Sequence, residues 1–332
     1  MRFSSWLPAL LLPSWVLAQT PAATRFREAA DYSRAHAGDA VLVLHADQIV
    51  FEEYHNGYRA DTPHMLASGT KSFSCAIAVA AIQDGLLSSF DEPVALTITE
   101  WRADSLKSKI TIRHLLNLSS GLPAGPSGFE GIRRQRNADA IGLTLVSKPG
   151  ETFRYGSSHY HVFGEVMRGK LKGEATGAYL QRRVLDRIGL TGLRIIPDRE
   201  GQSHLPGGGF ATAREWAKFG QLMRDRGKWK GNEVLRPALL EQCFAPSPAN
   251  ADYGLTFWLS TNARNDLIAD AMRARGRGRG QIVGNPVPVI MAAGAQNQRL
   301  YILRDLDLVV LRFGRQDLTY DDAHFLTLIR RN

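Results

Sequence analysis

Strand-like segments lie at both ends of this 332-residue chain, and helix-like segments fill its middle. Near the N-terminus, residues 40–45 and 49–54 are rich in β-branched and aromatic residues and flank a short turn. Further strand-like segments cover residues 255–259, 287–291, 299–303 and 306–313. A strand buries its apolar face only within a sheet, so we expect both ends of the chain to share one sheet, with the helical middle inserted between them.

Helical spacing predicts a series of helices around and inside this sheet. They cover residues 20–36, 68–82, 112–117, 160–168, 177–186, 213–226 and 321–331. We therefore expect a single domain, residues 19–332, built from an α/β (α+β) lobe and a helical lobe with a site between them. The α/β lobe would take residues of about 19–85 and 250–332, and the helical lobe about 86–249.

The first eighteen residues read as a signal peptide. Arg2 gives a short positive start, and the apolar stretch that follows is interrupted by Pro8 and Pro13. Small or apolar residues precede a cleavage site after Ala18. This stretch is too short and too proline-rich for a stable membrane span, and no later segment is apolar enough for one. We expect a periplasmic or secreted protein without a membrane span after processing.

Composition excludes several other classes of protein. With 44% hydrophobic and 22% charged residues, the chain has enough apolar material for a core. Two cysteines, Cys75 and Cys243, are too few for a disulfide scaffold or a zinc cluster; they can pair, but Cys75 lies in an apolar helical segment that favours a core position. The net charge is +9, and the alternating arginines of residues 273–279 favour a solvated loop over a polyanion-binding patch.

The strongest chemical motif is Ser68-Gly69-Thr70-Lys71, the only serine in the chain followed by lysine three residues later. On a helix, positions i and i+3 share a face, so the Ser68 hydroxyl and the Lys71 amine can meet. The positive end of that helix favours a neutral amine and a developing anion. The alternative is a helix cap beside a solvated lysine, because serine is a good N-cap. The apolar helix that follows argues for a buried, functional Lys71.

Two further segments can complete such a site. Tyr155 follows a turn and precedes a helix, where its phenol can relay protons. Met291-Ala292-Ala293-Gly294-Ala295 puts small residues on a strand, which lets a substrate backbone approach. There the N–H of Ala295 can complete an oxyanion hole with that of Ser68. The alternatives are a structural tyrosine and a tight packing position in the sheet.

The order of these elements resembles the class C β-lactamase and penicillin-recognising serine hydrolase family over nearly the whole mature length. Supporting stretches are residues 85–94, 111–122 and 207–216. The resemblance implies a β-lactamase/transpeptidase-like fold, with an antiparallel sheet flanked by helices plus a helical lobe. It also implies that Ser68 is the nucleophile, Lys71 the base, Tyr155 the proton relay and Ala295 the second oxyanion donor, without metal or cofactor.

The chain departs from this family pattern at two positions. The family's Tyr-x-Asn is here Tyr155-Gly156-Ser157, so a hydroxyl replaces the amide that contacts substrate. The family's Lys-Thr-Gly is here Ala292-Ala293-Gly294, which removes the ammonium that binds a substrate carboxylate. The pattern is closer to the family's esterases and nylon-oligomer hydrolases. We therefore expect an exported serine hydrolase that cleaves a small ester or amide, with Ser157, Gly294 and Ala295 lining the substrate site.

Other functions remain open or are disfavoured. A catalytically weak member that binds peptidoglycan or β-lactams, and a true β-lactamase or D,D-peptidase, are the alternatives within the family; Arg154 or Arg299 would then replace the missing lysine. No Gly-x-Ser-x-Gly or His-Glu-x-x-His motif occurs. His159 and His161 diverge on a helix, so a metal site is not expected, and nucleic acid is not an expected partner. His114 is expected to be structural.

Overall fold

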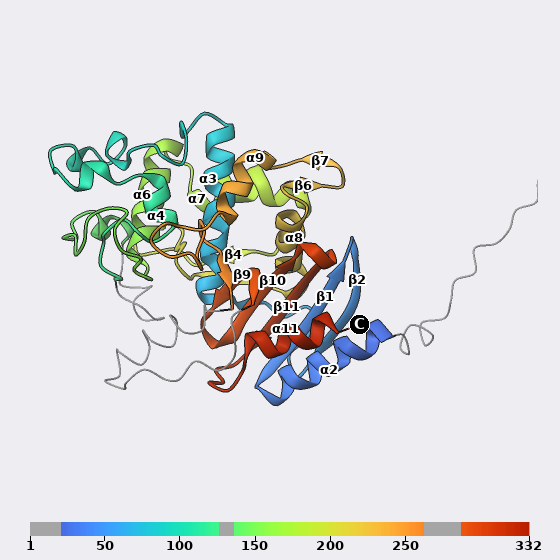
Figure 1. The fold of residues 1–332 in the computed structure, drawn as a ribbon. Helices are drawn as coiled ribbons and strands as arrows, with labels where there is room; N and C mark the ends of the chain where they lie inside the picture. The colour runs from blue at the N-terminus through green and yellow to red at the C-terminus, as the bar shows by residue number, and fades with distance from the viewer. Residues whose placement is uncertain (1–20, 126–135, 262–286, 332) are drawn as a thin grey trace, which may run out of the picture.

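A computed structural model describes residues 21–125, 136–261 and 287–331 (Figure 1). In this part of the chain, six antiparallel strands form the main sheet in the order β2-β1-β11-β10-β9-β8. Their bounds are β1 (Gly38–His45), β2 (Gln48–Tyr54), β8 (Trp258–Ser260), β9 (Pro288–Gly294), β10 (Gln298–Leu303) and β11 (Leu308–Gly314). Strand β1 pairs with β11, from the far end of the chain. The prediction that both ends share one sheet is confirmed.

Helices cover the two faces of this sheet. Helices α2 (Pro21–Ala35) and α11 (Asp322–Arg330) pack together beside β1, as Figure 1 shows in blue and red. Helix α8 (Ala213–Arg224) packs against β1, β10 and β11. Alternate residues of β10 point to opposite faces, and Leu300 reaches Gly220 of α8 whereas Arg299 reaches Asp322 of α11. The pair α2 and α11 therefore lies on the face opposite α8.

The remaining helices lie in the upper part of Figure 1, above the main sheet. They are α3 (Phe73–Gln83), α4 (Ile112–Leu116), α6 (Ser158–Leu171), α7 (Thr176–Leu180) and α9 (Pro237–Leu240). Two small sheets accompany them, β3 (His64–Met65) with β5 (Gly209–Ala211) and β4 (Arg194–Ile195), and β6 (Lys228–Trp229) with β7 (Asn232–Glu233). Helix α3 is completely buried over most of its length, because nearly all of its side chains are small or apolar. It runs through the centre of the molecule.

Several predicted bounds differ from the observed ones for local reasons. The strand expected at 255–259 begins only at Trp258, because Thr256 takes a left-handed conformation with φ of 79°. The helix expected at 177–186 is divided into α7, a π-helical turn at Gln181–Leu185 and a 3₁₀ turn at Asp186–Ile188. Leu306 belongs to a 3₁₀ turn, so the last strand starts at Leu308.

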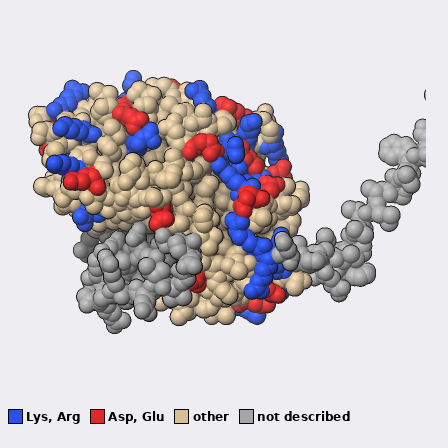
Figure 2. All heavy atoms as spheres, viewed as in Figure 1, with Lys and Arg blue, Asp and Glu red and all other residues tan. Residues whose placement is uncertain are grey.

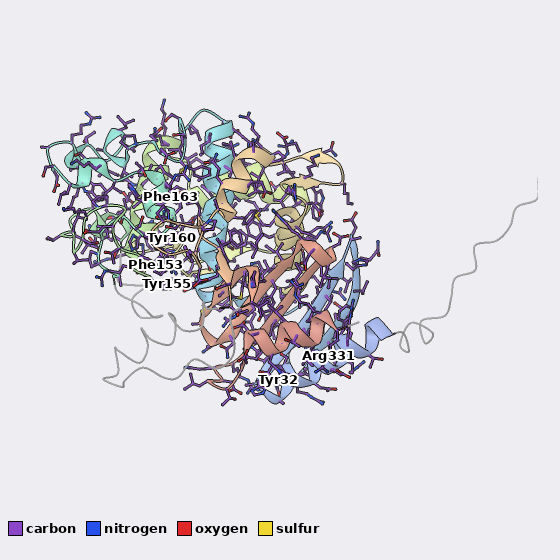
Figure 3. All side chains as sticks on the ribbon, viewed as in Figure 1. Tyr32, Phe153, Tyr155, Tyr160, Phe163 and Arg331 are labelled. Atoms are coloured by element: carbon purple, nitrogen blue, oxygen red, sulfur yellow. A yellow bond between two sulfur atoms is a disulfide. The ribbon has the colours of Figure 1, made fainter. Side chains whose placement is uncertain are left out.

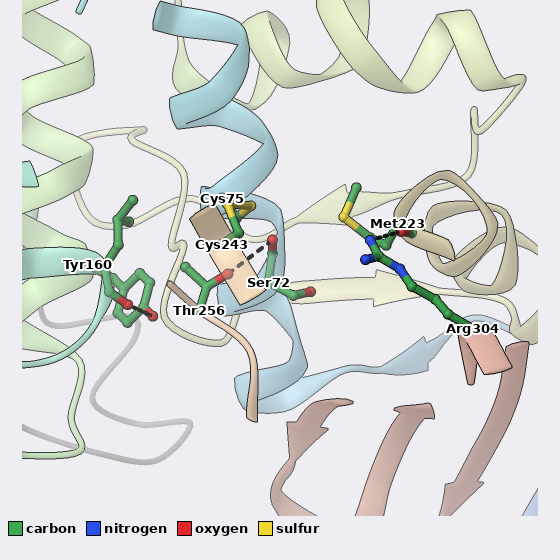
Figure 4. The surroundings of a disulfide bond; sticks show 8 residues. Ser72, Cys75, Tyr160, Met223, Cys243, Thr256 and Arg304 are labelled. Atoms are coloured by element: carbon green, nitrogen blue, oxygen red, sulfur yellow. Dashed lines mark hydrogen bonds between the residues drawn. A yellow bond between two sulfur atoms is a disulfide. The ribbon is translucent and has the colours of Figure 1, made fainter. Parts of the chain in front are cut away.

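Cys75 and Cys243 form a disulfide that joins α3 to the 3₁₀ turn Glu241–Phe244 (Figure 4). Both residues are fully buried, so Cys75 occupies the expected core position and is also paired. Beside the disulfide, Thr256 Oγ1 donates to the Ser72 carbonyl at 3.4 Å. The first turns of α3 are therefore anchored to a segment that lies 168 residues away in the sequence.

On the face shown in Figure 2, basic and acidic side chains are interspersed. Ion pairs among the described residues include Arg27 with Glu53 and Arg331 with Glu28. The predicted signal peptide and the arginine-rich stretch at 273–279 lie outside the described residues. No helix in the part of the chain that the structure describes is long and apolar enough to cross a membrane.

Candidate active site

Ser68 lies at the start of the helical segment that becomes α3. Residues Ala67–Ser72 form a 3₁₀ turn that leads directly into α3. Ala67 has a left-handed conformation with φ of 48°, a strained arrangement for a residue with a side chain. This turn redirects the chain after Leu66, whose N–H donates to the Gly209 carbonyl at 2.8 Å. Ser68 is left half-buried at the entrance to the helix.

Lys71 is buried directly behind Ser68, as the motif predicted. Its Nζ lies 3.0 Å from Ser68 Oγ and donates to the Pro206 carbonyl at 2.6 Å. Only 4% of Lys71 is exposed, and burial lowers the pKa of its amine from 10.5 to about 7. The cause of this shift is desolvation by burial. At neutral pH, a large fraction of the amine is therefore uncharged and able to accept a proton.

A glycine-rich segment packs around the 3₁₀ turn and holds Pro206 in place. Thr70 Oγ1 accepts a hydrogen bond from the Gly209 N–H at 2.9 Å. A Cβ on Gly69 would lie 2.7 Å from the Trp216 ring, so the close approach of α8 requires glycine there. Residues 207–216, which support the family resemblance, thus position the turn that carries Ser68 and Lys71.

Tyr155 lies next to Lys71, within an aromatic cluster made of Phe153, Tyr155, Tyr253 and Trp258. The ring of Tyr155 stacks on Trp258 with centroids 5.6 Å apart, and Lys71 Nζ lies 5.1 Å from the centre of the Tyr155 ring. Tyr160 of α6 also faces the amine, at 5.6 Å. Figure 3 shows Phe153, Tyr155 and Tyr160 one beside another at α3. The structure therefore brings Ser68, Lys71 and Tyr155 together.

Strand β9 ends against the same turn. A Cβ on Gly294 would lie 2.1 Å from the Leu66 carbonyl oxygen and 3.2 Å from the Gly69 nitrogen, so only glycine permits this contact. The next residue, Ala295, is exposed. Within the described ranges, the N–H groups of Ser68 and Ala295 donate to no turn, loop or capping acceptor. The contact of Gly294 with Leu66 and Gly69 thus brings the residue that follows β9, Ala295, close to the turn that carries Ser68.

The cation that the family pattern lacks at position 292 is not replaced by Arg299. Ala292 is buried and pairs in register with Leu300, whose side chain reaches α8. Arg299 points to the opposite face, where Asp322 holds it in a buried ion pair at 2.7 Å.

The other arginine expected as a substitute for the missing lysine, Arg154, is exposed next to Tyr155. Ser157 is half-buried, and its N–H donates to the Ala124 carbonyl at 2.6 Å.

The histidines near the site serve its framework. His159 bridges Ser120 Oγ at 2.8 Å and the Arg154 carbonyl at 2.9 Å, and burial lowers its pKa to about 4. His161 has different partners, Asn137 Oδ1 at 2.7 Å and the ring of His204. His114 closes the capping box of α4 with Thr111, which confirms its structural role. Nowhere in the described ranges do three His, Cys, Asp or Glu side chains gather in a way that could hold a metal ion.

Some of the residues that shape this site carry no local signal in the sequence. The Pro206 carbonyl that binds Lys71 is contributed 135 residues further along the chain, and a backbone carbonyl has no residue signature. Trp258 and Trp216 look like ordinary core aromatics until the fold places them against Tyr155 and Gly69.

Known proteins share this arrangement of sheet and helices. A family model described as Beta-lactamase matches residues 22–313. The 6-aminohexanoate-dimer hydrolase of Paenarthrobacter ureafaciens is 25% identical over 264 residues, which cover 69% of this chain and 66%, just under two thirds, of that protein. A putative beta-lactamase from Bacteroides dorei superposes with a TM-score of 0.72 at 17% identity, over 92% of this chain and 97% of that one. EstCE1, described as a hydrolase with promiscuous acyltransferase activity, gives 0.68 at 16% identity, over 93% and 97%.

These likenesses agree on the fold. The antiparallel sheet, its covering helices and the central α3 form the β-lactamase/transpeptidase-like fold that the motifs implied. Because one family model spans the sheet, the helical part and the segment of Ser68 and Lys71 together, the chain belongs to the beta-lactamase family of hydrolases.

Proposed function

We propose that this chain is an exported serine hydrolase that cleaves an ester or amide through an acyl-enzyme on Ser68. The observation that carries this proposal is the 3.0 Å contact between Ser68 Oγ and the buried amine of Lys71. An amine with a pKa of about 7 is well matched to remove a hydroxyl proton at neutral pH. A solvated lysine in a merely structural turn would keep its ordinary pKa.

In the proposed reaction, neutral Lys71 takes the proton of Ser68 while Oγ attacks the substrate carbonyl. The N–H groups of Ser68 and Ala295 hold the oxyanion of the tetrahedral intermediate. Tyr155, beside the Lys71 amine, passes the proton to the leaving group, whose departure leaves the acyl group on Ser68. Water then attacks this ester while Lys71 accepts the proton of the water. As the second tetrahedral intermediate collapses, Lys71 returns this proton to Ser68 Oγ, and the acid is released.

The substrate we propose is a small ester or amide that carries no carboxylate at the position facing Ala292. The methyl group of Ala292 offers no charge there, and Arg299 is occupied by Asp322 on the other face of the sheet. A charged hydrogen bond is worth about 1.5–3 kcal/mol, so a carboxylate-bearing β-lactam loses roughly tenfold or more in binding compared with a site that has the lysine. A relative named 6-aminohexanoate-dimer hydrolase acts on a small amide, which supports the amide part of this proposal.

Export is the second part of the proposal. The predicted signal peptide favours a periplasmic or secreted location, and the Cys75–Cys243 disulfide suits an oxidising compartment.

Competing substrates test the proposal on the purified mature protein. We expect kcat/KM for a p-nitrophenyl ester of a short acid to exceed that for nitrocefin at least tenfold. Ala292→Lys should shift this ratio towards nitrocefin, whereas Ser68→Ala, the control, should remove both activities. A nitrocefin value equal to or above the ester value would identify a β-lactamase. If a wider set of esters, amides and β-lactams also gave no turnover, the chain would be a binding protein and not an enzyme.

A further inference from the structure

A buried guanidinium, that of Arg299, donates a hydrogen bond to the peptide unit between Gly294 and Ala295. Arg299 Nη1 donates to the Gly294 carbonyl at 3.1 Å and to the Gln298 carbonyl at 3.0 Å. Only 2% of Arg299 is exposed, so water cannot substitute for these contacts. The Gly294 carbonyl belongs to the same planar peptide as the Ala295 N–H, and no peptide bond in the described residues is cis. An acceptor bond at one end of this peptide therefore orients the donor at its other end.

The guanidinium is itself held rigidly. Asp322 accepts hydrogen bonds from Arg299 Nε at 2.7 Å and from Arg299 Nη2 at 3.1 Å. This bidentate contact fixes the orientation of the guanidinium. The hydroxyl of Tyr301 also donates to Asp322, and it contacts the Tyr320 hydroxyl at 2.8 Å. Asp322 lies in the first turn of α11, whose capping residue Asp321 donates its N–H to the Tyr32 hydroxyl of α2 at 2.8 Å. Figure 3 shows Tyr32 at the α2–α11 face, away from Tyr155.

Burial of the Arg299–Asp322 ion pair costs desolvation free energy, so we expect the pair to serve the active site. A buried ion pair often contributes little net stability, because two charges must be desolvated. Hydrogen bonds in a chain polarise one another, so a cation on the Gly294 carbonyl makes the Ala295 N–H a stronger donor. Gly294 in turn contacts the Leu66 carbonyl and Gly69, on either side of Ser68. The cation thus acts on the site through one peptide, from the far face of the sheet.

We propose that Arg299, held by Asp322, is a positioning residue that orients and polarises the Ala295 N–H as an oxyanion donor. The inference rests on the proposed acyl-enzyme chemistry at Ser68. Removing a whole oxyanion donor costs about a hundredfold to a thousandfold in kcat. Loosening the peptide that carries it should cost less, so Arg299→Lys is expected to lower kcat by about tenfold to a hundredfold, with little change in KM.

Arg312 supplies a matched control. It pairs in register with Arg299 on the neighbouring strand, is equally buried, and donates to the Asn297 carbonyl in the same turn but not to the peptide of Ala295. Arg312→Lys should therefore change kcat by less than about threefold if the effect passes through the Gly294–Ala295 peptide. A fall equal to that of Arg299→Lys would show that general loosening of the turn, not this peptide, is responsible, and would overturn the inference.

In the acyl-enzyme, the infrared stretching frequency of the ester carbonyl on Ser68 reports on the donors of the oxyanion hole. A purely structural role of Arg299 would leave this frequency unchanged. Strong donors in the oxyanion hole lower this frequency. We expect the band to shift to higher frequency in folded Arg299→Lys and to stay in place in Arg312→Lys. If Arg299→Lys does not fold, Asp322→Asn keeps the side-chain shape and should shift the band in the same direction. An unmoved band with unchanged kcat in either folded variant refutes the inference. A wild-type protein without any ester band instead refutes the proposed function, and the inference with it.

Discussion

Replacing Lys71 by methionine is expected to abolish turnover and, at pH 7, to make the folded protein more stable. Lys71 is 4% exposed and has no acidic partner among the groups that shift its pKa. The folded state must therefore either desolvate an ammonium or give up its proton. Methionine has a similar length and is at home in a buried site.

The size of the effect follows from the pKa shift. In the unfolded chain the amine titrates at 10.5, and in the folded protein at about 7. At pH 7 this difference costs the wild type about 4 kcal/mol of folding free energy, and the cost falls below about 0.5 kcal/mol at pH 10.5. Between pH 7 and 10.5 the unfolded chain binds more protons than the folded protein. The free energy of unfolding of the wild type therefore rises with pH in this range. Methionine also leaves the Pro206 carbonyl without its donor, which costs about 1–3 kcal/mol.

The net expectation is that Lys71→Met stabilises the protein by about 1–3 kcal/mol at pH 7 and destabilises it by a similar amount at pH 10.5. Urea unfolding at pH 7, 8.5 and 10.5 measures this crossover. Ser68→Ala is the control, because it retains Lys71 and should keep the pH dependence of the wild type. A difference between Lys71→Met and wild type that is constant with pH would refute the claim that Lys71 is folded with a depressed pKa.

Three further perturbations address the rest of the site. Tyr155→Phe should lower kcat by about a hundredfold to ten-thousandfold, whereas Tyr253→Phe, in the same aromatic cluster, should leave it nearly unchanged; equal activities would remove Tyr155 from the proton path. The value of kcat/KM should rise with pH through an apparent pKa near 7, and a flat profile from about pH 6 to 9 would contradict Lys71 as base. Joint replacement of Cys75 and Cys243 by alanine should lower the free energy of unfolding by about 2–5 kcal/mol, because the disulfide links residues 168 positions apart. Chemical denaturation measures this change, and an unchanged free energy of unfolding would show that the disulfide contributes nothing to stability.

Much of the fold was predictable because its signals are local. The β1–β2 hairpin is marked by alternating apolar residues around a short turn, and α3 by a long alanine-rich stretch that ends at Gly85. That both ends of the chain share one sheet followed from the need to bury their strands, but the pairing of β1 with β11 was not predicted. Where the bounds were wrong, as at Thr256, a single left-handed residue interrupted an otherwise strand-like stretch.

The site was predictable only in part, for the same reason. Ser68 and Lys71 are three residues apart, so helical geometry alone brings them together. The depressed pKa of Lys71 depends on burial by segments far away in the sequence, which a local motif does not reveal. The sequence offers Arg299 as a substitute for the missing lysine, but strand alternation places Arg299 on the opposite face of the sheet, with Asp322. Which face an isolated strand residue takes is settled only by the register of the whole sheet.

The most direct test of the central claim is to identify the residue that carries the acyl group. The mature protein, incubated with a fluorophosphonate or a slowly hydrolysed activated ester, should gain one adduct per chain, and peptide mapping should place it on Ser68. Ser68→Ala should gain none, and Lys71→Met should react at least a hundredfold more slowly, the lower end of what a general base contributes. An adduct on any other serine, or labelling that is unaffected in Ser68→Ala, would contradict the account.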